Sequence, residues 1–159
     1  MFRELARKNK QLTEAECIRI LTEEKRGVLS VNGDDGYPYG MPMNHFYDPD
    51  SGKIYFHSGK SEGHRLCSLK ADNKVSFCVY DSGCKNDGDW ALSISSVIVF
   101  GKVSVIDDLN TIIDISARLS RKFTDDEGYI QKEIKAFSRE TLILQLTPEH
   151  ICGKRVKEA

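Results

Sequence analysis

The sequence contains no long hydrophobic run. Its longest uninterrupted stretch of aliphatic and aromatic residues is Val-Ile-Val-Phe at residues 97–100, whereas a membrane-spanning helix needs about 20 apolar residues. The N-terminal segment carries charges throughout and has no apolar core of the kind found in secretion signals. We therefore expect a cytoplasmic protein that does not insert into a membrane.

Neither sign of charge is in excess. The chain of 159 residues holds 23 Lys and Arg against 24 Asp and Glu, for a formal net charge of −1. A protein that binds nucleic acid through a broad basic surface carries a marked positive excess, so we expect no nucleic-acid partner. Any site that binds an anion must therefore depend on a local group of cations.

Paired cysteines and metal-binding motifs are also missing. The five cysteines are odd in number and form no Cys-x-x-Cys pair, which argues against a disulfide framework and against a zinc site. We interpret Cys17, Cys67 and Cys78 as small core residues, and we expect no metal. The chain has no P-loop and no Gly-x-Gly-x-x-Gly motif, so a Rossmann dinucleotide site is not supported.

The chain does contain short β-type segments separated by tight turns rich in Gly, Asp and Pro. The expected strands cover residues 27–32, 38–48, 53–58, 75–80, 90–106 and 141–146. Turns this short cannot carry parallel crossovers, so antiparallel pairing is expected to dominate the first half of the chain. Pro42 predicts an edge position for the second strand, and residues 95–96 and 101 predict a bulge in the long one. Closure into a small barrel would remove exposed edges.

Helices are expected between some of these strands. Thr13 and Glu16 form a capping box at the start of a helix over residues 14–25. A short helix is expected over residues 62–71, and a third follows Asp107 or Asp108. On the third helix we expect one shared face, made of Leu109, Ile112, Ile113, Ser116 and Leu119. No structure is assigned to residues 122–133, and the basic tail from Gly153 is expected to fray. The length suits one domain over residues 1–159.

Residues 57–65, His-Ser-Gly-Lys-Ser-Glu-Gly-His-Arg, carry the most informative pattern. They follow a strand and open a helix, and a helix N-terminus offers unpaired N–H groups and a partial positive charge to an anion. Ser61 is the expected cap. Lys60, His64 and Arg65 add cationic groups within one turn of that end. The pattern predicts a phosphate pocket; the alternative is a solvated surface loop with ordinary charges.

Two further segments are weaker candidates. Alternating side chains at residues 41–44, Met-Pro-Met-Asn, could lie against a flat ring system, although core packing is the commoner role of Met. Residues 95–97, Ser-Ser-Val, offer hydroxyl groups beside an apolar run, although Ser in a strand usually bonds only locally.

Together, these segments resemble the pyridoxamine 5′-phosphate oxidase-related FMN-binding family, and most closely its 5-nitroimidazole resistance (nitroimidazole reductase) branch. The resemblance covers nearly the whole chain and depends on the order and spacing of several short segments. These segments are residues 1–4, 33–39, 54–58, 62–65, 75–79, 96–102 and 150–155.

The resemblance implies a mainly β (β+α) fold: an FMN-binding split β-barrel of Greek-key type, with six or so antiparallel strands and flanking helices, that works as a homodimer. The family's phosphate-binding loop falls on Ser58, Lys60, His64 and Arg65. Its strands that contact the isoalloxazine ring fall on Pro42, Met43, Asn44, Phe56 and His57. The segment Ser95, Ser96 and Val97 would approach the flavin from the partner subunit.

The implied activity is that of a flavin-dependent oxidoreductase, with NAD(P)H as the donor and a small acceptor such as a 5-nitroimidazole. His57 matches the histidine implicated in activity in that branch and is the expected catalytic residue. FAD, a deazaflavin or haem replaces FMN in some members. The alternatives are a non-catalytic flavin- or haem-binding protein and a pyridoxamine 5′-phosphate oxidase-like enzyme. Residues 153–155 offer no clear counterpart of the Arg-bearing segment that holds substrate phosphate in true oxidases, which disfavours the second alternative.

Overall fold

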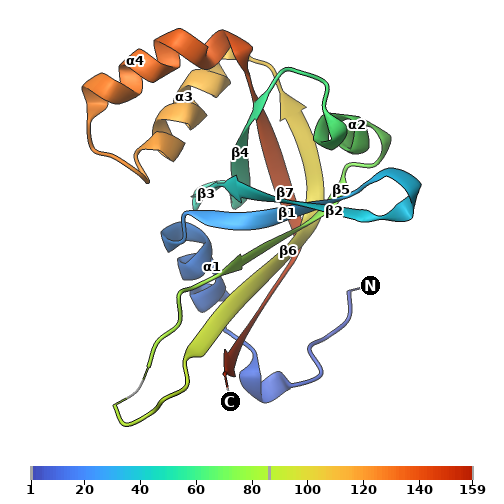
Figure 1. Cartoon of the computed structure of the whole chain (residues 1–159), viewed down its shortest axis with the longest axis vertical. Coiled ribbons are helices and arrows are strands. Elements are labelled where there is room, and N and C mark those ends of the chain that lie inside the picture. Colours follow the sequence, from blue (N-terminus) through green and yellow to red (C-terminus); the bar gives the residue numbers. More distant parts are fainter. Residues whose placement is uncertain (1, 86, 159) are drawn as a thin grey trace.

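The computed structural model describes residues 2–85 and 87–158. Residues 1 and 159, which are the two ends of the predicted domain, lie outside the described residues. Residue 1 also belongs to the first of the segments that carry the resemblance. Within the described ranges, one seven-stranded antiparallel sheet is flanked by four α-helices (Figure 1). The strands are β1 Arg26–Asn32, β2 Pro38–Asn44, β3 Phe46–Asp48, β4 Lys53–Gly59, β5 Lys74–Tyr80, β6 Ser93–Ile106 and β7 Thr141–Lys157. The helices are α1 Glu14–Glu23, α2 His64–Ala71, α3 Leu109–Ser120 and α4 Glu127–Phe137.

The sheet runs in the order β2-β1-β5-β6-β7-β4-β3, with every neighbouring pair antiparallel. The mainly β fold with flanking helices is therefore confirmed, and β2, which contains Pro42, lies at an edge as expected. Strands β6 and β7 run along the long axis of the molecule (Figure 1). Helices α3 and α4 lie at one end of this pair and the C-terminus lies at the other.

A bulge interrupts the β6–β7 pairing beside Gly101. Phe100 pairs with His150 but Gly101 pairs with Pro148, so Glu149 is the extra residue of the bulge on β7. A Cβ atom at Gly101 would collide with the backbone oxygen of Thr147, so the strands approach too closely there for a side chain. The bulge predicted at residue 101 is confirmed, whereas residues 95–96 pair in regular register.

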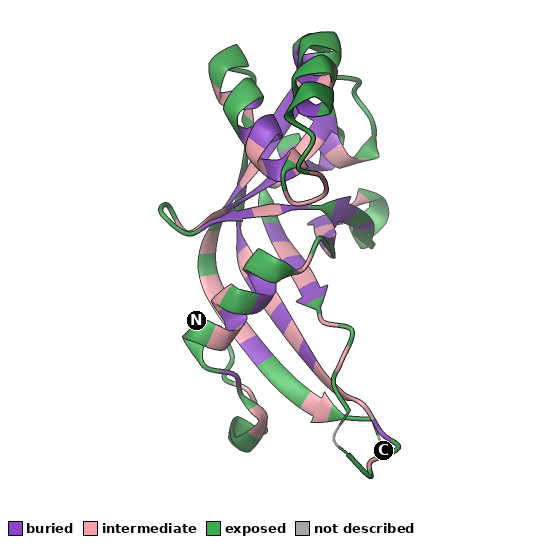
Figure 2. Cartoon of the chain, turned by 90° about the vertical axis from the view of Figure 1, so that its left-hand side faces the viewer, coloured by how far each residue is buried: buried purple, intermediate pink, exposed green. Residues whose placement is uncertain are grey.

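The main core lies on the concave side of the sheet, and α1 closes it. Cys17, Ile20 and Leu21 of α1 pack into one cluster with inward residues of the strands, among them Leu29 and Phe77. The capping box is present, because Thr13 accepts from the Glu16 backbone N–H and Glu16 accepts from Thr13. The helix ends at Glu23, two residues earlier than predicted. Figure 2 shows the alternation of buried and half-buried residues along the long strands.

The other helices pack on smaller clusters. Ile112 and Ile115 of α3 cover Tyr55 and Ile143 on the outward side of β4 and β7. Helix α4 packs mainly through Ile130 and Ile134 against Ala117 of α3. None of the helices in the described part of the chain is both long and apolar enough to cross a membrane.

Three strand boundaries differ markedly from the prediction, and the first is the start of β6, which lies at Ser93 and not at residue 90. The expected strand 38–48 is split into β2 and β3 at His45, whose side chain turns fully inward and lies with Nε2 2.8 Å from the carbonyl oxygen of Leu21. The tail from Gly153 does not fray: β7 continues to Lys157 and stays paired with β6. Gly153 fits there because it packs directly beneath Leu12 and Cys17.

The helical predictions need three corrections. Residues 127–137 form α4, although no structure was assigned to most of them. Leu109 and Ile113 are exposed, whereas Ile115 lies on the buried face of α3, so that face was placed partly wrongly. Helix α2 begins at His64, and Gly63 is its N-cap residue without a side-chain bond; Ser61 lies too early in the chain to cap it.

The three cysteines assigned to the core differ in burial. Cys17 is buried, as predicted, because it packs on the core side of α1. Cys78 is half-buried on the outer face of β5. Cys67 was placed wrongly: it lies on the outer side of α2 and is exposed.

Candidate functional site

Strand β4 separates the predicted site into two sides. Neighbouring residues of a strand point to opposite faces of the sheet. Phe56 and Ser58 point inward and are buried, whereas His57 points outward toward α3 and is half-buried. Phe56 is fully buried, with its ring centroid 4.9 Å from that of Phe77 in the core, so its side chain is occupied by packing. A ligand outside the core could touch only the backbone of Phe56.

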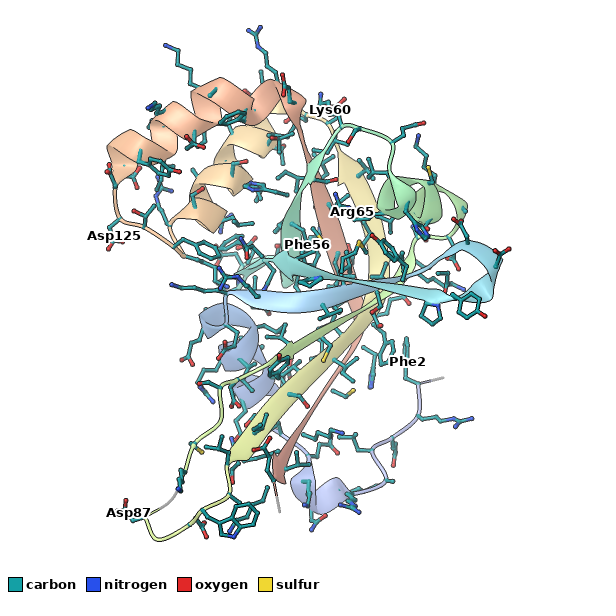
Figure 3. All side chains as sticks on the ribbon, viewed as in Figure 1. Phe2, Phe56, Lys60, Arg65, Asp87 and Asp125 are labelled. Atoms are coloured by element: carbon teal, nitrogen blue, oxygen red, sulfur yellow. The ribbon has the colours of Figure 1, made fainter. Side chains whose placement is uncertain are left out.

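Arg65 reaches from the start of α2 into the inward side of β4. Its Nη2 donates to Oγ of Ser58 over 2.7 Å, and Nη1 lies 4.0 Å from the sulfur of Met43. The Nε–H of Arg65 is buried and has no hydrogen-bond partner in the described part of the chain. Figure 3 shows Arg65 between α2 and the strands, close to Phe56 in that view. Arg65 and Ser58 are thus brought together as predicted, at the uncapped N-terminus of α2.

The other two cations of this loop have different partners. Lys60 lies just beyond the end of β4 (Figure 3). Its Nζ is 2.5 Å from Oδ1 of Asp107. His64 stacks on Tyr39 with ring centroids 4.2 Å apart, and its Nε2 lies 3.6 Å from Asp34. Both contacts are substantially exposed, and even a true ion pair in such a setting contributes at most about 1 kcal/mol. In the protein as described, Lys60, His64 and Arg65 do not converge on one point.

A cavity of about 450 Å³ lies on the outward side of β4. It is open to solvent on one side and is bordered by the end of β2, by β4, by α3 and α4, and by the start of β7. Its lining combines aromatic and aliphatic side chains with several hydroxyl groups. The lining residues are Asn44, His57, Ser116, Leu119, Ser120, Phe123, Thr124, Tyr129, Glu133, Ile134, Phe137, Ser138 and Thr141. Asn44 and His57 are the two predicted site residues that this cavity brings together.

His57 is held at this cavity by Ser116 of α3. The Nε2 atom of His57 lies 2.9 Å from Oγ of Ser116, and Ser116 is itself buried. Burial of the ring lowers the pKa of His57, because a charged imidazolium loses its hydration there. The imidazole is therefore neutral at pH 7, able to donate one hydrogen bond and to accept another.

The remaining β2 residues point in different directions. Met43 is buried in the core, whereas Pro42 and Asn44 are exposed at the edge of the sheet. Pro42 lies beside a second depression of about 630 Å³, formed with residues 23–28 and 80–82. Of the segment 42–44, only Asn44 reaches the cavity beside His57.

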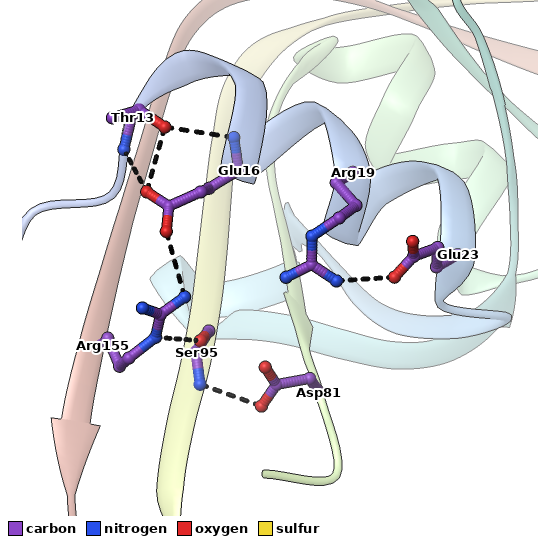
Figure 4. A network of polar contacts seen from close by, with 7 residues as sticks. All are labelled: Thr13, Glu16, Arg19, Glu23, Asp81, Ser95 and Arg155. Atoms are coloured by element: carbon purple, nitrogen blue, oxygen red, sulfur yellow. Dashed lines mark hydrogen bonds and ion pairs between the residues drawn. The ribbon is translucent and has the colours of Figure 1, made fainter. Parts of the chain in front are cut away.

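Ser95, Ser96 and Val97 lie far from this cavity within one chain. His57 pairs with Ile143, which pairs in turn with Ile106 at the other end of β6. At about 3.3 Å per residue, Ser96 lies about 30 Å further along that strand. Val97 is fully buried. Ser95 is buried too; its Oγ accepts from Arg155 and its N–H donates to Asp81 (Figure 4). Ser96 alone is half-buried, on the outer face of the sheet.

Sequence reasoning did not assign a site role to Ser116 or to the residues of α4. Ser116 was placed on the packing face of its helix, where it was the one polar member among Leu and Ile. A lone hydroxyl group on an apolar face is the signal that could have identified it. No comparable signal exists for Tyr129 and Glu133, because α4 itself was not predicted.

Comparison with known proteins identifies the family. The sequence model of the pyridoxamine 5′-phosphate oxidase family matches residues 13–155. The chain belongs to this family. No curated protein sequence matches it. The family assignment agrees with the predicted resemblance, while the 5-nitroimidazole resistance branch is a finer statement that this match does not make.

Solved structures share the fold, which is the split β-barrel of this family. A candidate 5-nitroimidazole antibiotic resistance protein from Bacteroides thetaiotaomicron aligns with a TM-score of 0.76 at 19% identity, over 92% of this chain and 87% of that one. A conserved hypothetical protein from Mycobacterium tuberculosis gives 0.79 at 15%, over 95% and 90%. An FAD-binding protein from Mesorhizobium loti gives 0.64 at 22%, over 92% and 97%.

Proposed function

We propose that this chain is an FMN-dependent reductase of the 5-nitroimidazole resistance branch, which passes electrons from NAD(P)H to a small acceptor. One observation carries the proposal: β4 presents an arginine–serine pair at a helix N-terminus on one side and a buried, neutral histidine beside a cavity on the other. Family membership and the likeness to the Bacteroides protein support it. We place the protein in the cytoplasm, as a single domain.

The residues at the start of α2 fit a phosphate group. The first turn of α2 has no side-chain cap, so its backbone N–H groups can meet an anion. Arg65 adds a guanidinium whose buried Nε–H lacks a partner, an arrangement that costs free energy until an acceptor arrives. Ser58 would contribute its hydroxyl group, and Lys60 and His64 could join by leaving their exposed partners Asp107 and Asp34.

The cavity fits a ring system of modest size. Its volume of about 450 Å³ lies within the range of small-molecule pockets, about 300–1,000 Å³. Asn44 and His57 would hold the polar edge of a ring, and Phe123 and Phe137 would pack on apolar surface. Pro42 and Met43 would contribute through backbone groups near the end of β2, and Phe56 through its backbone in the middle of β4.

In the proposed reaction the bound flavin supplies the electron-transfer chemistry. The contribution of the chain is to bind and orient the reactants. Arg65 and Ser58 fix the phosphate end. His57 orients the acceptor through a hydrogen bond, or donates a proton to it from its imidazolium form in the manner of general acid catalysis. The apolar side chains of α3 and α4 would limit the access of water to this side of β4 once a ligand fills the cavity.

We propose a homodimer in which each subunit completes the site of the other. The outer face of the sheet supports this proposal, because Val28, Cys78, Ile98 and Cys152 lie side by side on four successive strands and are all only half-buried. A second copy packed on this face would cover that apolar row. It would also bring a partner's Ser96 region to the cavity, which Ser95–Val97 cannot reach within one chain.

The visible spectrum of freshly purified protein tests the cofactor. We expect a yellow protein from which mass spectrometry identifies FMN. Its absorption band should bleach on addition of NAD(P)H and recover on addition of a 5-nitroimidazole. A colourless protein whose melting temperature FMN does not raise would refute the proposal, because a ligand at a hundredfold excess over its dissociation constant stabilises by about 2.7 kcal/mol.

A second candidate is a flavin carrier without turnover. The FAD-binding protein from Mesorhizobium loti, which shares the fold, favours it. A carrier would be yellow but would show no steady-state consumption of NAD(P)H with any acceptor. If FAD, a deazaflavin or haem were extracted in place of FMN, that molecule would be the cofactor. If the protein formed pyridoxal phosphate with oxygen, its reaction would be that of a pyridoxamine 5′-phosphate oxidase-like enzyme.

A further inference from the structure

We propose that Ser116 positions His57 and fixes which ring nitrogen of His57 carries the proton. The inference deepens the proposed function, since it rests on His57 acting on an acceptor in the cavity. Ser116 lies in the middle of α3, 59 residues from His57 along the chain, yet its Oγ and Nε2 of His57 are 2.9 Å apart. Both side chains line the same cavity.

The direction of this hydrogen bond follows from the burial of Ser116. With 7% of its surface exposed, its O–H group needs an acceptor inside the protein. Hydroxyl groups within helices often donate to the carbonyl four residues earlier, as Thr22 does to Ile18. Ser116 makes no such bond with any described residue. The acceptor within reach is Nε2 of His57, so the hydroxyl group donates to this nitrogen.

The donated bond determines the tautomer of the imidazole. A neutral imidazole has one N–H group and one nitrogen with a lone pair. When Nε2 accepts from Ser116, the proton must lie on Nδ1. The opposite arrangement would leave the buried hydroxyl hydrogen unpaired, at a cost in free energy. His57 therefore offers Nδ1–H as a hydrogen-bond donor to a polar oxygen of a molecule in the cavity.

The surroundings of His57 keep it neutral. Burial lowers its pKa, and acceptance of a hydrogen bond at Nε2 favours the neutral form further. Besides His57 itself, the titratable groups among the lining residues are Tyr129 and Glu133, both on α4. The β2, β4, α3 and β7 sides contribute Asn44 and uncharged hydroxyl groups instead.

Nitrogen-15 NMR of the full-length protein without flavin tests the assignment directly, because protonated and unprotonated ring nitrogens have distinct shifts. His57→Gln identifies the His57 signals among those of the four histidines. We expect the Nδ1–H tautomer in the wild type. Ser116→Ala should shift the population toward Nε2–H and raise the pKa of His57 by about half a unit to one unit, the scale of one hydrogen bond. Ser116→Thr, which keeps a hydroxyl group, should restore both.

Ser120→Ala is the matched control, because Ser120 lies one turn further along α3 and lines the same cavity. It should leave the tautomer of His57 unchanged. An Nε2–H tautomer in the wild type, or the same tautomer in Ser116→Ala and the wild type, would overturn the proposal. Should Ser116→Ala fail to fold, the wild-type tautomer alone still decides.

Turnover measurements separate this inference from the proposed function. In the flavin-loaded enzyme, Ser116→Ala should raise KM for the acceptor severalfold and move the pH profile, with flavin content unchanged. A shifted tautomer in a protein that reduces no acceptor would refute the proposed function and leave Ser116 as the positioning residue. Normal reduction with an unchanged pH profile would refute the role of Ser116 and leave the function standing.

Discussion

Helices α1 and α4 are amphipathic helices of similar length that flank the same sheet, yet they contribute in different ways. Helix α1 inserts Cys17, Ile20 and Leu21 into the main core, and none of these side chains is more than 3% exposed. Helix α4 packs on α3 through Ile130 and Ile134, and its remaining inward surface borders a cavity. Helix α1 therefore stabilises the fold mainly by burying apolar side chains in the main core. Helix α4 instead forms part of the wall of a cavity.

The largest expected effect tests this contrast directly. Leu21→Ala should lower the free energy of unfolding by about 2–5 kcal/mol, because it opens a void in a closed core. Ile134→Ala should cost about 2 kcal/mol or less, because Ile134 already borders an open cavity and loses fewer contacts. Urea unfolding followed by circular dichroism measures both. Equal losses for the two variants would contradict the division between the two helices.

The buried His45 beneath α1 makes stability depend on pH. Burial, with a smaller contribution from the charge of Lys122, lowers the pKa of His45 to about 4 from the ordinary value of 6.5. Between these values the unfolded chain binds a proton that the folded chain does not bind. Stability is therefore full above about pH 6.5 and falls as the pH drops toward about 4, by roughly 3 kcal/mol.

Unfolding in urea at several pH values between 7 and 4 checks this prediction. His45→Gln should flatten the profile, because the amide can still donate to the carbonyl of Leu21 but does not titrate. Burial also lowers the pKa of His57, so a smaller slope of the same sign should persist in this variant. An unchanged slope in His45→Gln would assign the pH dependence to other groups.

At the candidate site, substitutions should change ligand binding more than stability. Arg65→Ala should weaken FMN binding by roughly 1.5–3 kcal/mol, the scale of a hydrogen bond to a charged group. Flavin fluorescence titration measures this. Lys70→Ala is the control, because it removes a positive charge from the same helix but from a side chain that pairs with Glu62. Equal affinities for the wild type and Arg65→Ala would remove Arg65 from the phosphate site.

The smallest predicted effect concerns the start of α1. Thr13→Ala should cost about 1 kcal/mol, because it removes the side-chain acceptor of the Glu16 N–H. The loss should appear in global stability, since α1 closes the core. Asp126→Ala, which removes the corresponding cap of α4, should increase hydrogen exchange in α4 with a smaller change in global stability. Global unfolding that responds equally to both caps would contradict the comparison.

Local patterns in the sequence predicted the features that depend on local chemistry. The capping box at Thr13 and the edge position of Pro42 are both present. Helix α4 was missed because its apolar residues are few and lie among charges, and their spacing has meaning only opposite α3. The tail after Gly153 looked polar and flexible, but its backbone pairs with β6, a distant segment.

The candidate site shows the same limit. The meeting of Arg65 and Ser58 follows from a strand–loop–helix corner that the sequence shows plainly. The orientations of the Lys60 and His64 side chains do not follow from this corner, because each contacts a carboxylate contributed by another loop. The bond between Ser116 and His57 joins residues brought together only by the packing of α3 on β4, so spacing along the chain could not reveal it.

The alternation of side chains along β4 has a consequence for how such a protein could diversify. His57 and Ser58 are adjacent in sequence but open onto separate compartments of the molecule. Substitutions in α3 and α4 can therefore change the lining of the cavity without altering the contact between Arg65 and Ser58. A single residue inserted before His57 would instead exchange the two compartments, so the site depends more strictly on the length of β4 than on the cavity-facing residues of the helices.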